Sequence, residues 1–273
     1  MPHLRSLTYQ APAQAAGFPF TIAALKALTT LDLSARVTFF IGENGSGKST
    51  VLESLALAAN LPTVGSESVE GDPTLAALRP LAKCFKLAWA KKATRGFFLR
   101  AEDFFGFAKR QAQMRAEMEQ DIADIREEYK GRSKTALGLA LMPFGRELGD
   151  MKRLYGEGLD SQSHGESFFK LFQARFVPNG LYLLDEPEAP LSPLRQMALL
   201  GQINAMLVHN AQFIIATHSP ILMAYPGARL YAFDGGSIQS IAYDDTEHVR
   251  VTRAFLDNPK SALKHLFDPR PDD

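Results

Sequence analysis

The chain has 273 residues, of which 46% are hydrophobic and 22% are charged, and this composition excludes a disordered chain. Lysine and arginine together number 30, as do aspartate and glutamate, so the net charge neither indicates a polyanionic partner nor excludes a local basic patch. The single cysteine, Cys84, excludes an internal disulfide framework or a cysteine metal cluster. No apolar run approaches the ~20 residues that span a bilayer, and the chain begins without a signal-peptide pattern, so we expect a cytoplasmic protein.

In chain order, the first predicted strands are 18–25 and 37–41. The second is a short, continuously apolar run of the kind found in buried parallel sheets. A glycine-rich loop follows, and apolar residues then recur at helical spacing over 48–60. Segments 84–90 and 96–100 are β-like and flank a basic turn, which predicts a hairpin or paired edge strands.

The segment 104–129 predicts an amphipathic helix, because apolar residues recur on one face at spacings of three and four. That face carries Met114, Met118, Ile122, Ile125 and Tyr129. The pattern is too short for a sustained coiled coil. The glycine-rich stretch 131–160 gives no clear assignment.

The last third of the chain alternates helical and strand patterns, which favours an α/β fold with a mostly parallel core sheet. It ends in two β-like runs joined by an aspartate and two glycines, a hairpin signal. The predicted elements are helices at 166–177 and 194–209, strands at 181–184 and 213–217, and a hairpin of 229–233 with 238–243.

A phosphate-binding pattern, G-x-x-x-x-G-K-[ST], is matched in full between a predicted strand and a predicted helix. Glycines let successive backbone N–H groups surround phosphate oxygens, and the helix adds its positive end. Lys48 would reach the β- and γ-phosphates of ATP, and the Ser49 hydroxyl would bind Mg²⁺. The alternative is a glycine-rich turn that only caps a helix. The candidate nucleotide-binding residues are Gly42, Glu43, Asn44, Gly45, Ser46, Gly47, Lys48, Ser49 and Thr50.

Two further strands deliver polar groups at their carboxyl ends, where open α/β sheets bind ligands. The strand 181–184 ends in Asp185 and Glu186, whose side chains point to opposite sides. One carboxylate can hold magnesium while its neighbour polarises the attacking water. The strand 213–217 ends at His218, a candidate γ-phosphate sensor. The alternatives are a polar strand end entering a turn and a structural histidine.

These three elements, in this order, resemble the ATP-binding-cassette (ABC) ATPases. Lys48 and Ser49 match the Walker A motif, Asp185 and Glu186 match the Walker B motif with its catalytic glutamate, and His218 matches the switch histidine. Just before Walker B, the sequence QSHGES looks like a diverged form of the family signature, with Ser163 and Gly165 at the matching positions. The alternative for this stretch is a plain helix cap.

The signature, the PEAPLSP stretch and THSP look closer to stand-alone ATPases of the RecF-like and chromosome-maintenance branches than to transporter cassettes. Ser192 stands at about the position of the D-loop aspartate, and Glu102 is the only candidate for the Q-loop glutamine. Phe18 and Phe20 are candidates for adenine stacking, and they fit core positions equally well.

The resemblance implies a single ABC-type ATPase domain over 1–273. Its core is a P-loop α/β sheet with an antiparallel β subdomain, and a helical lobe that contains the signature is inserted at about 103–178. It implies that Lys48, Glu186 and His218 are catalytic, that Ser49 and Asp185 hold Mg²⁺, and that ATP closes two copies into a head-to-tail homodimer.

Three rival functions remain at this point. The first is the ATP-binding subunit of a membrane transporter, which would have membrane partners. The second is a DNA-linked ATPase, although an acidic run at 117–128 interrupts the basic stripe that would contact nucleic acid. The third is a small-molecule kinase, which fits a water-activating glutamate poorly. The stripe consists of Lys83, Lys86, Lys91, Lys92, Arg95, Lys109, Arg110 and Arg115.

Overall fold

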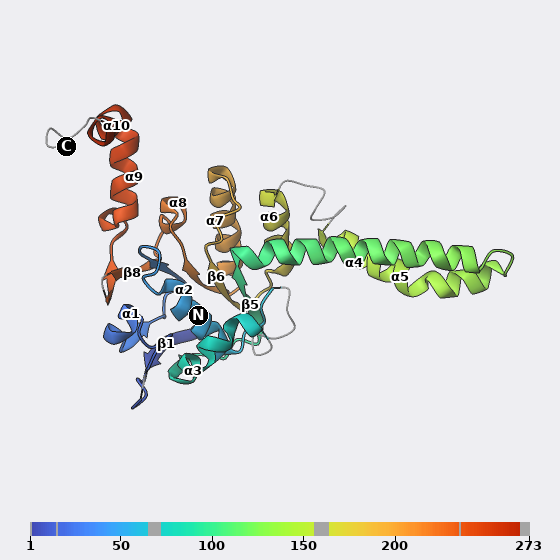
Figure 1. The fold of residues 1–273 in the computed structure, drawn as a ribbon, viewed down its shortest axis with the longest axis horizontal. Helices are drawn as coiled ribbons and strands as arrows, with labels where there is room; N and C mark the ends of the chain where they lie inside the picture. Colours follow the sequence, from blue (N-terminus) through green and yellow to red (C-terminus); the bar gives the residue numbers. More distant parts are fainter. Residues whose placement is uncertain (1, 15, 65–71, 156–163, 235, 268–273) are drawn as a thin grey trace.

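The computed structural model describes residues 2–14, 16–64, 72–155, 164–234 and 236–267. In this part of the chain the strands form two sheets, one with the order β2–β1–β4 and one with the order β5–β6–β7–β3–β8–β9 (Figure 1). The small sheet is antiparallel, and the large sheet is parallel except for the pairing of β8 with β9. The predicted fold class, a mostly parallel core sheet with an antiparallel β subdomain, is confirmed.

The strands of the small sheet are β1 (Leu4–Tyr9), β2 (Thr30–Asp32) and β4 (Phe85–Trp89). Those of the large sheet are β3 (Val37–Ile41), β5 (Arg95–Arg100), β6 (Gly180–Asp185), β7 (Gln212–Ala216), β8 (Arg229–Asp234) and β9 (Ser237–Ile241). The main helices are α1 (Ala23–Ala27), α2 (Lys48–Ala59), α3 (Arg79–Lys83), α4 (Ala101–Glu128), α5 (Lys134–Tyr155), α6 (His164–Arg175), α7 (Pro193–Val208), α8 (Pro220–Met223), α9 (Glu247–Asp257) and α10 (Pro259–Phe267).

The central strands are continuously apolar because both faces of the large sheet are covered. Phe39 of β3 packs into the core that includes α6 and α7, whereas its neighbour Phe40 packs into the core that includes α2 and the small sheet. Ile215 and Ile214 of β7 divide between the two cores in the same way. The alternation of side chains along each strand therefore holds two helical layers to one sheet.

Helices α4 and α5 pack against each other and project far from the sheet as a two-helix hairpin (Figure 1). The predicted amphipathic helix is confirmed, and its partner is α5, which occupies most of the glycine-rich stretch left unassigned. Half-buried apolar residues recur at helical spacing on both helices, for example Ile122 and Ile125 on α4, and Leu141 and Phe144 on α5. No helix in the described ranges has the length and apolar character needed to cross a membrane.

Two predicted elements are wrong. Residues 18–25 do not form a strand but a turn followed by α1, because Gly17 takes a positive φ of 74° and its carbonyl accepts the Phe20 N–H at 3.0 Å. The segments 84–90 and 96–100 do contain strands but are not paired with each other. β4 pairs with β1 in the small sheet, whereas β5 pairs with β6 in the large one.

Candidate active site

Four neighbouring strands of the large sheet, β5, β6, β7 and β3, bring the candidate residues to one edge. The phosphate-binding loop follows β3, Asp185 ends β6 and His218 lies just beyond β7. Asp185 is in register with Ala216 on one side and with Arg100 at the end of β5 on the other. The carboxyl edge of a parallel sheet is where α/β proteins bind ligands, so the sheet order alone assembles the site.

The loop between β3 and α2 needs glycine at two of its motif positions. At Gly42, φ is 141° and an added Cβ would lie 2.3 Å from the carbonyl oxygen of Phe233. At Gly47, φ is 99° and an added Cβ would lie 2.6 Å from Ile22 Cγ2. Any side chain at either position would therefore strain the backbone and displace its neighbour. Lys48, Ser49 and Thr50 lie in the first turn of α2, and the residues before them form the loop that joins β3 to this helix.

Lys48 lies folded over the loop. It is 4% exposed, and Nζ donates to the carbonyl oxygens of Gly42 at 2.7 Å and Glu43 at 2.8 Å. Burial lowers the pKa of Lys48, and the nearby carboxylates of Glu186 and Asp185 oppose that shift. The ammonium group is thus held at the loop by neutral carbonyl groups, which phosphate oxygens can replace as stronger, charged acceptors.

Ser49 and Asp185 meet at the end of β6, where the Ser49 hydroxyl donates to Asp185 Oδ1 at 3.1 Å. Burial raises the pKa of Asp185 to about 7, and the hydrogen bond from Ser49 partly offsets it. They line a cavity of about 250 Å³ with Glu53, Arg100, Ala101 and Glu186. A hydroxyl and a desolvated carboxylate are oxygen ligands that suit Mg²⁺, which keeps several waters and needs few protein ligands. The residues therefore fit the ion.

Glu186 lines the same cavity but contacts a different partner. Its backbone is in the left-handed region with φ 48°, its N–H donates to the Ala216 carbonyl at 2.9 Å, and its Oε1 lies 3.6 Å from His218 Nε2. A non-glycine residue at positive φ costs free energy and is common at functional sites. The two adjacent carboxylates thus reach different partners, Ser49 for Asp185 and His218 for Glu186.

Three residues of the site were missed by sequence reasoning. Glu188 Oε1 accepts the His218 N–H at 2.7 Å, His248 Nε2 lies 3.0 Å from His218 Nδ1, and Arg100 lines the cavity beside Asp185. Burial raises the pKa of Glu188. Glu188 carries a local signal, since it follows the Walker B glutamate by two residues. Nothing in the sequence near His248 or Arg100 marks them as site residues.

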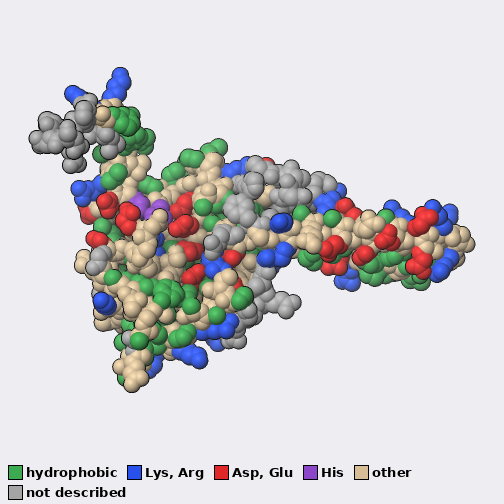
Figure 2. Space-filling model, viewed as in Figure 1, with side chains coloured by type: hydrophobic (Ala, Val, Ile, Leu, Met, Phe, Trp, Pro, Cys, Tyr) green, Lys and Arg blue, Asp and Glu red, His purple; other side chains and the backbone are tan. Residues whose placement is uncertain are grey.

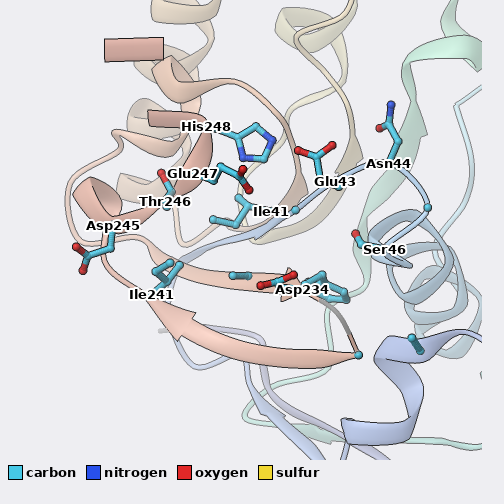
Figure 3. Close-up of a pocket in the computed structure, with 16 residues that line it drawn as sticks. Ile41, Glu43, Asn44, Ser46, Asp234, Ile241, Asp245, Thr246, Glu247 and His248 are labelled. Atoms are coloured by element: carbon cyan, nitrogen blue, oxygen red, sulfur yellow. The ribbon is translucent and has the colours of Figure 1, made fainter. Parts of the chain in front are cut away.

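A cavity of about 450 Å³ lies on the other side of the loop, between the loop, the β8–β9 turn and the start of α9. Figure 3 shows Thr246, Glu247 and His248 along one wall, and the loop residues Glu43 and Asn44 across from them. Four carboxylates line it, those of Glu43, Asp234, Asp245 and Glu247. This negative lining suits a nucleotide's neutral base and ribose hydroxyls better than its phosphates.

The structure describes most, but not all, of the candidate residues for the signature, the Q-loop and the D-loop. Ser163 lies outside the described residues, and Gly165 is in the first turn of α6. Glu102 is in the first turn of α4, two residues beyond Arg100, and Arg100 and Ala101 line the cavity with Asp185. Ser192 caps α7.

Neither adenine-stacking candidate lines the cavity beside the loop. Phe18 is 62% exposed, whereas Phe20 packs against the core that includes α2. Phe18 is therefore not the core residue that the sequence allowed, whereas Phe20 is partly buried against the core.

The basic residues predicted as a stripe are distributed over several elements. Lys83 is on α3, Lys86 is on β4, and Lys109 is on α4. Along the α4–α5 hairpin, acidic and basic side chains are interspersed (Figure 2). Arg95 and Arg110, however, line one cavity of about 550 Å³ at the base of the hairpin together with Arg175, and none of its lining residues within the described ranges is acidic.

Two family models match parts of the chain. One is described as an AAA domain, putative AbiEii toxin, Type IV TA system, and matches 166–224. The other is described as an AAA domain and matches 22–71. The first range contains Asp185, Glu186 and His218, and the second contains the phosphate-binding loop. None of the curated proteins matches the chain.

Solved structures with a similar fold include ABC transporter cassettes and an Smc head domain. CbiO1 from Clostridium perfringens, part of an ABC transporter complex, is 12% identical, covers 97% of this chain and 98% of its own, and gives a TM-score of 0.48. An ABC transporter cassette in its ADP conformation is 14% identical, with coverage of 98% and 100% and a TM-score of 0.47. The Smc head domain from Pyrococcus furiosus, bound to the C-terminal domain of ScpA, is 12% identical, with coverage of 95% and 100% and a TM-score of 0.45.

The class of protein follows from the phosphate-binding loop, the sheet order and the two AAA-domain matches. These findings support a nucleotide-binding P-loop ATPase, and the chain resembles the ABC/AAA class. The resemblance inferred from its motifs is confirmed at this level.

Proposed function

We propose that the chain hydrolyses ATP to ADP and phosphate in the presence of Mg²⁺, and that ATP closes two copies head to tail around the site. The observation that carries the proposal is the divergence of the two Walker B carboxylates. Asp185 is hydrogen-bonded to Ser49 at 3.1 Å, whereas Glu186 lies 3.6 Å from His218. One carboxylate is therefore available for a metal ion and the other for a water molecule.

The loop residues and Lys48 bind the phosphates, and Ser49 and Asp185 hold the metal ion. When bound, Mg²⁺ supplies neutralisation of the charge on the β- and γ-phosphate oxygens. Glu186 orients the attacking water and accepts its proton, and His218 contacts the terminal phosphoryl group. Lys48 is already within reach, because it donates only to carbonyl oxygens of the loop that would surround the phosphates.

The open side of the site supports the dimer. The side chains of Glu186 and His218 are 44% and 29% exposed, so a terminal phosphoryl group beside them would face solvent. Phosphoryl transfer benefits when the site is closed and bulk water is excluded. A second copy would close this side by presenting its signature residues, Ser163 and Gly165, to the phosphate.

The Glu186→Gln variant tests both parts of the proposal. It should bind ATP as the wild type does, release phosphate at least 100-fold more slowly, and elute as a dimer with ATP but as a monomer with ADP. Light scattering after size exclusion gives the mass, and phosphate release gives the rate. A monomer with ATP would remove the dimer and leave the hydrolase, whereas wild-type turnover would remove the hydrolase.

A DNA-linked role is the second candidate, and the arginine-lined cavity favours it. Arg95, Arg110 and Arg175 come from β5, α4 and α6, and they line one cavity at the base of the hairpin. Guanidinium groups bind phosphate oxygens, and a nucleic acid held in this way is released by salt. The transporter alternative would instead need membrane partners, which the described residues do not reveal.

A further inference from the structure

His218 is held at its backbone N–H and at one ring nitrogen. Its backbone N–H donates to Glu188 Oε1 at 2.7 Å, and its Nδ1 lies 3.0 Å from His248 Nε2. Its other ring nitrogen, Nε2, lies 3.6 Å from Glu186 Oε1, is buried, and has no hydrogen-bond partner among the described residues. The imidazole is therefore fixed along one edge, and its unsatisfied nitrogen faces Glu186.

The His218 imidazole is neutral near pH 7, so the position of its single ring proton decides which nitrogen can donate a hydrogen bond. Burial lowers the pKa of His218, and the nearby ammonium of Lys48 lowers it further. A neutral imidazole carries a single proton, so one nitrogen donates and the other accepts. The groups around Nε2 are acceptors, namely the Glu186 carboxylate and, in the proposed reaction, phosphate oxygens. The proton is therefore favoured on Nε2, and Nδ1 must accept a hydrogen bond.

His248 can supply that hydrogen bond from a fixed position. It is the second residue of α9, and its ring lies 5.2 Å from that of His218 between centroids, tilted by 52°. The start of α9 is anchored by Thr246, which is 1% exposed and donates to the Tyr243 carbonyl at 2.8 Å, and by Val249, which is 3% exposed. The donor thus comes from the packed first turn of a helix.

We propose that His248 is a positioning residue that donates from Nε2 to Nδ1 of His218, so that His218 presents its Nε2–H to Glu186 and to the terminal phosphoryl group. His248 itself touches neither the nucleotide nor the attacking water. Its effect on turnover rests on the proposed function, whereas its effect on the His218 tautomer does not.

The tautomer is measured without nucleotide, by long-range ¹H–¹⁵N NMR of ¹⁵N-histidine-labelled protein. The wild type should show His218 protonated on Nε2 and accepting on Nδ1. The His248→Gln variant, whose side-chain amide can donate at a similar reach, should keep this pattern, and His248→Leu should give a mixture of tautomers. A wild-type His218 protonated on Nδ1, or a His218 spectrum unchanged in His248→Leu, would overturn the proposal.

Turnover gives the second readout. In His248→Leu, kcat should fall about 10-fold or more while KM for ATP stays within about 2-fold, because the lost interaction acts in the transition state. His248→Gln should restore kcat to within about 3-fold of the wild type. His209→Leu, at the exposed end of α7, is the matched control and should change neither constant. An unchanged kcat in His248→Leu would contradict the role, whereas a wild type without turnover would defeat the proposed function and leave the NMR result to decide on His248.

Discussion

Arg100 joins the base of the α4–α5 hairpin to the helix that follows the phosphate-binding loop. It stands between β5 and α4, and its side chain is 8% exposed. Its guanidinium pairs with Glu53 of α2 at 3.2 Å, with Asp72 at 3.4 Å and with Asp103 of α4 at 2.8 Å. It also donates to Thr74 Oγ1 at 2.9 Å.

The Arg100→Ala substitution should destabilise the protein strongly, because it leaves three carboxylates without their shared cation. Those carboxylate side chains are only 16%, 13% and 24% exposed, so water cannot fully replace the guanidinium. Breaking a buried ion pair by removing one partner costs about 3–5 kcal/mol. For a chain of this size, such a loss lowers Tm by roughly 6–20 °C.

Differential scanning calorimetry measures this shift, and Arg153→Ala is the matched control on the same hairpin. Arg153 pairs with Asp150 at 3.2 Å, but both side chains are more than half exposed. An exposed pair contributes about 0–1 kcal/mol, so the control should lower Tm by no more than about 4 °C. If Arg100→Ala shifted Tm no more than the control, the network would not hold the hairpin to α2.

Two further outcomes are expected. In metal-free buffer, Asp185→Asn should be more stable than the wild type at pH 8 by up to about 4 kcal/mol. The pKa of Asp185 is raised to about 7 in the folded protein, so ionisation of this carboxyl destabilises the fold as the pH rises from about 4 to 7. Thermal melts from pH 4 to pH 8 should therefore converge at low pH, and a constant difference would refute the burial of this charge. Arg110→Glu should weaken binding of a DNA duplex and reduce the slope of log affinity against log salt concentration. Arg153→Glu is the control and should have little effect. Equal DNA binding by the wild type and both variants would exclude the arginine-lined cavity as a nucleic-acid site.

The elements that sequence reasoning predicted well are those with strong local signals. The phosphate-binding loop combines a buried strand, fixed glycines and a helix start within a single stretch. β6 and β7 are almost entirely apolar, because both faces of the sheet are covered. Both can therefore be predicted as buried parallel strands without tertiary information.

The errors arose where pairing partners are distant. β1 was missed because its burial is uneven along the strand and its partners, β2 and β4, come later in the chain. β4 and β5 look like a hairpin by proximity, yet their patterns differ: β4 alternates between buried and more exposed residues, whereas β5 is buried over four consecutive residues. That contrast separates a half-exposed antiparallel strand from a parallel core strand, and it identifies two sheets.

The site was predictable where residues follow strands in sequence and unpredictable where they arrive from elsewhere. Asp185 and Glu186 lie at the end of an apolar strand, so their place at the sheet edge follows from the pattern. His248 reaches His218 only because the β8–β9 hairpin returns the chain to the phosphate-binding loop. The cavity lined by this loop, the β8–β9 turn and the start of α9 shows that return. Arg100 likewise reaches the site through the register of β5 with β6.

The central claim is that two adjacent carboxylates do different work, and a comparison of Asp185→Asn with Glu186→Gln tests it most directly. ATP affinity is titrated with and without Mg²⁺, and a single turnover is followed for each protein. We predict that Asp185→Asn loses the magnesium-dependent part of its affinity, whereas Glu186→Gln keeps that affinity and loses turnover. Two variants with the same affinity loss and the same rate would contradict the division between metal and water.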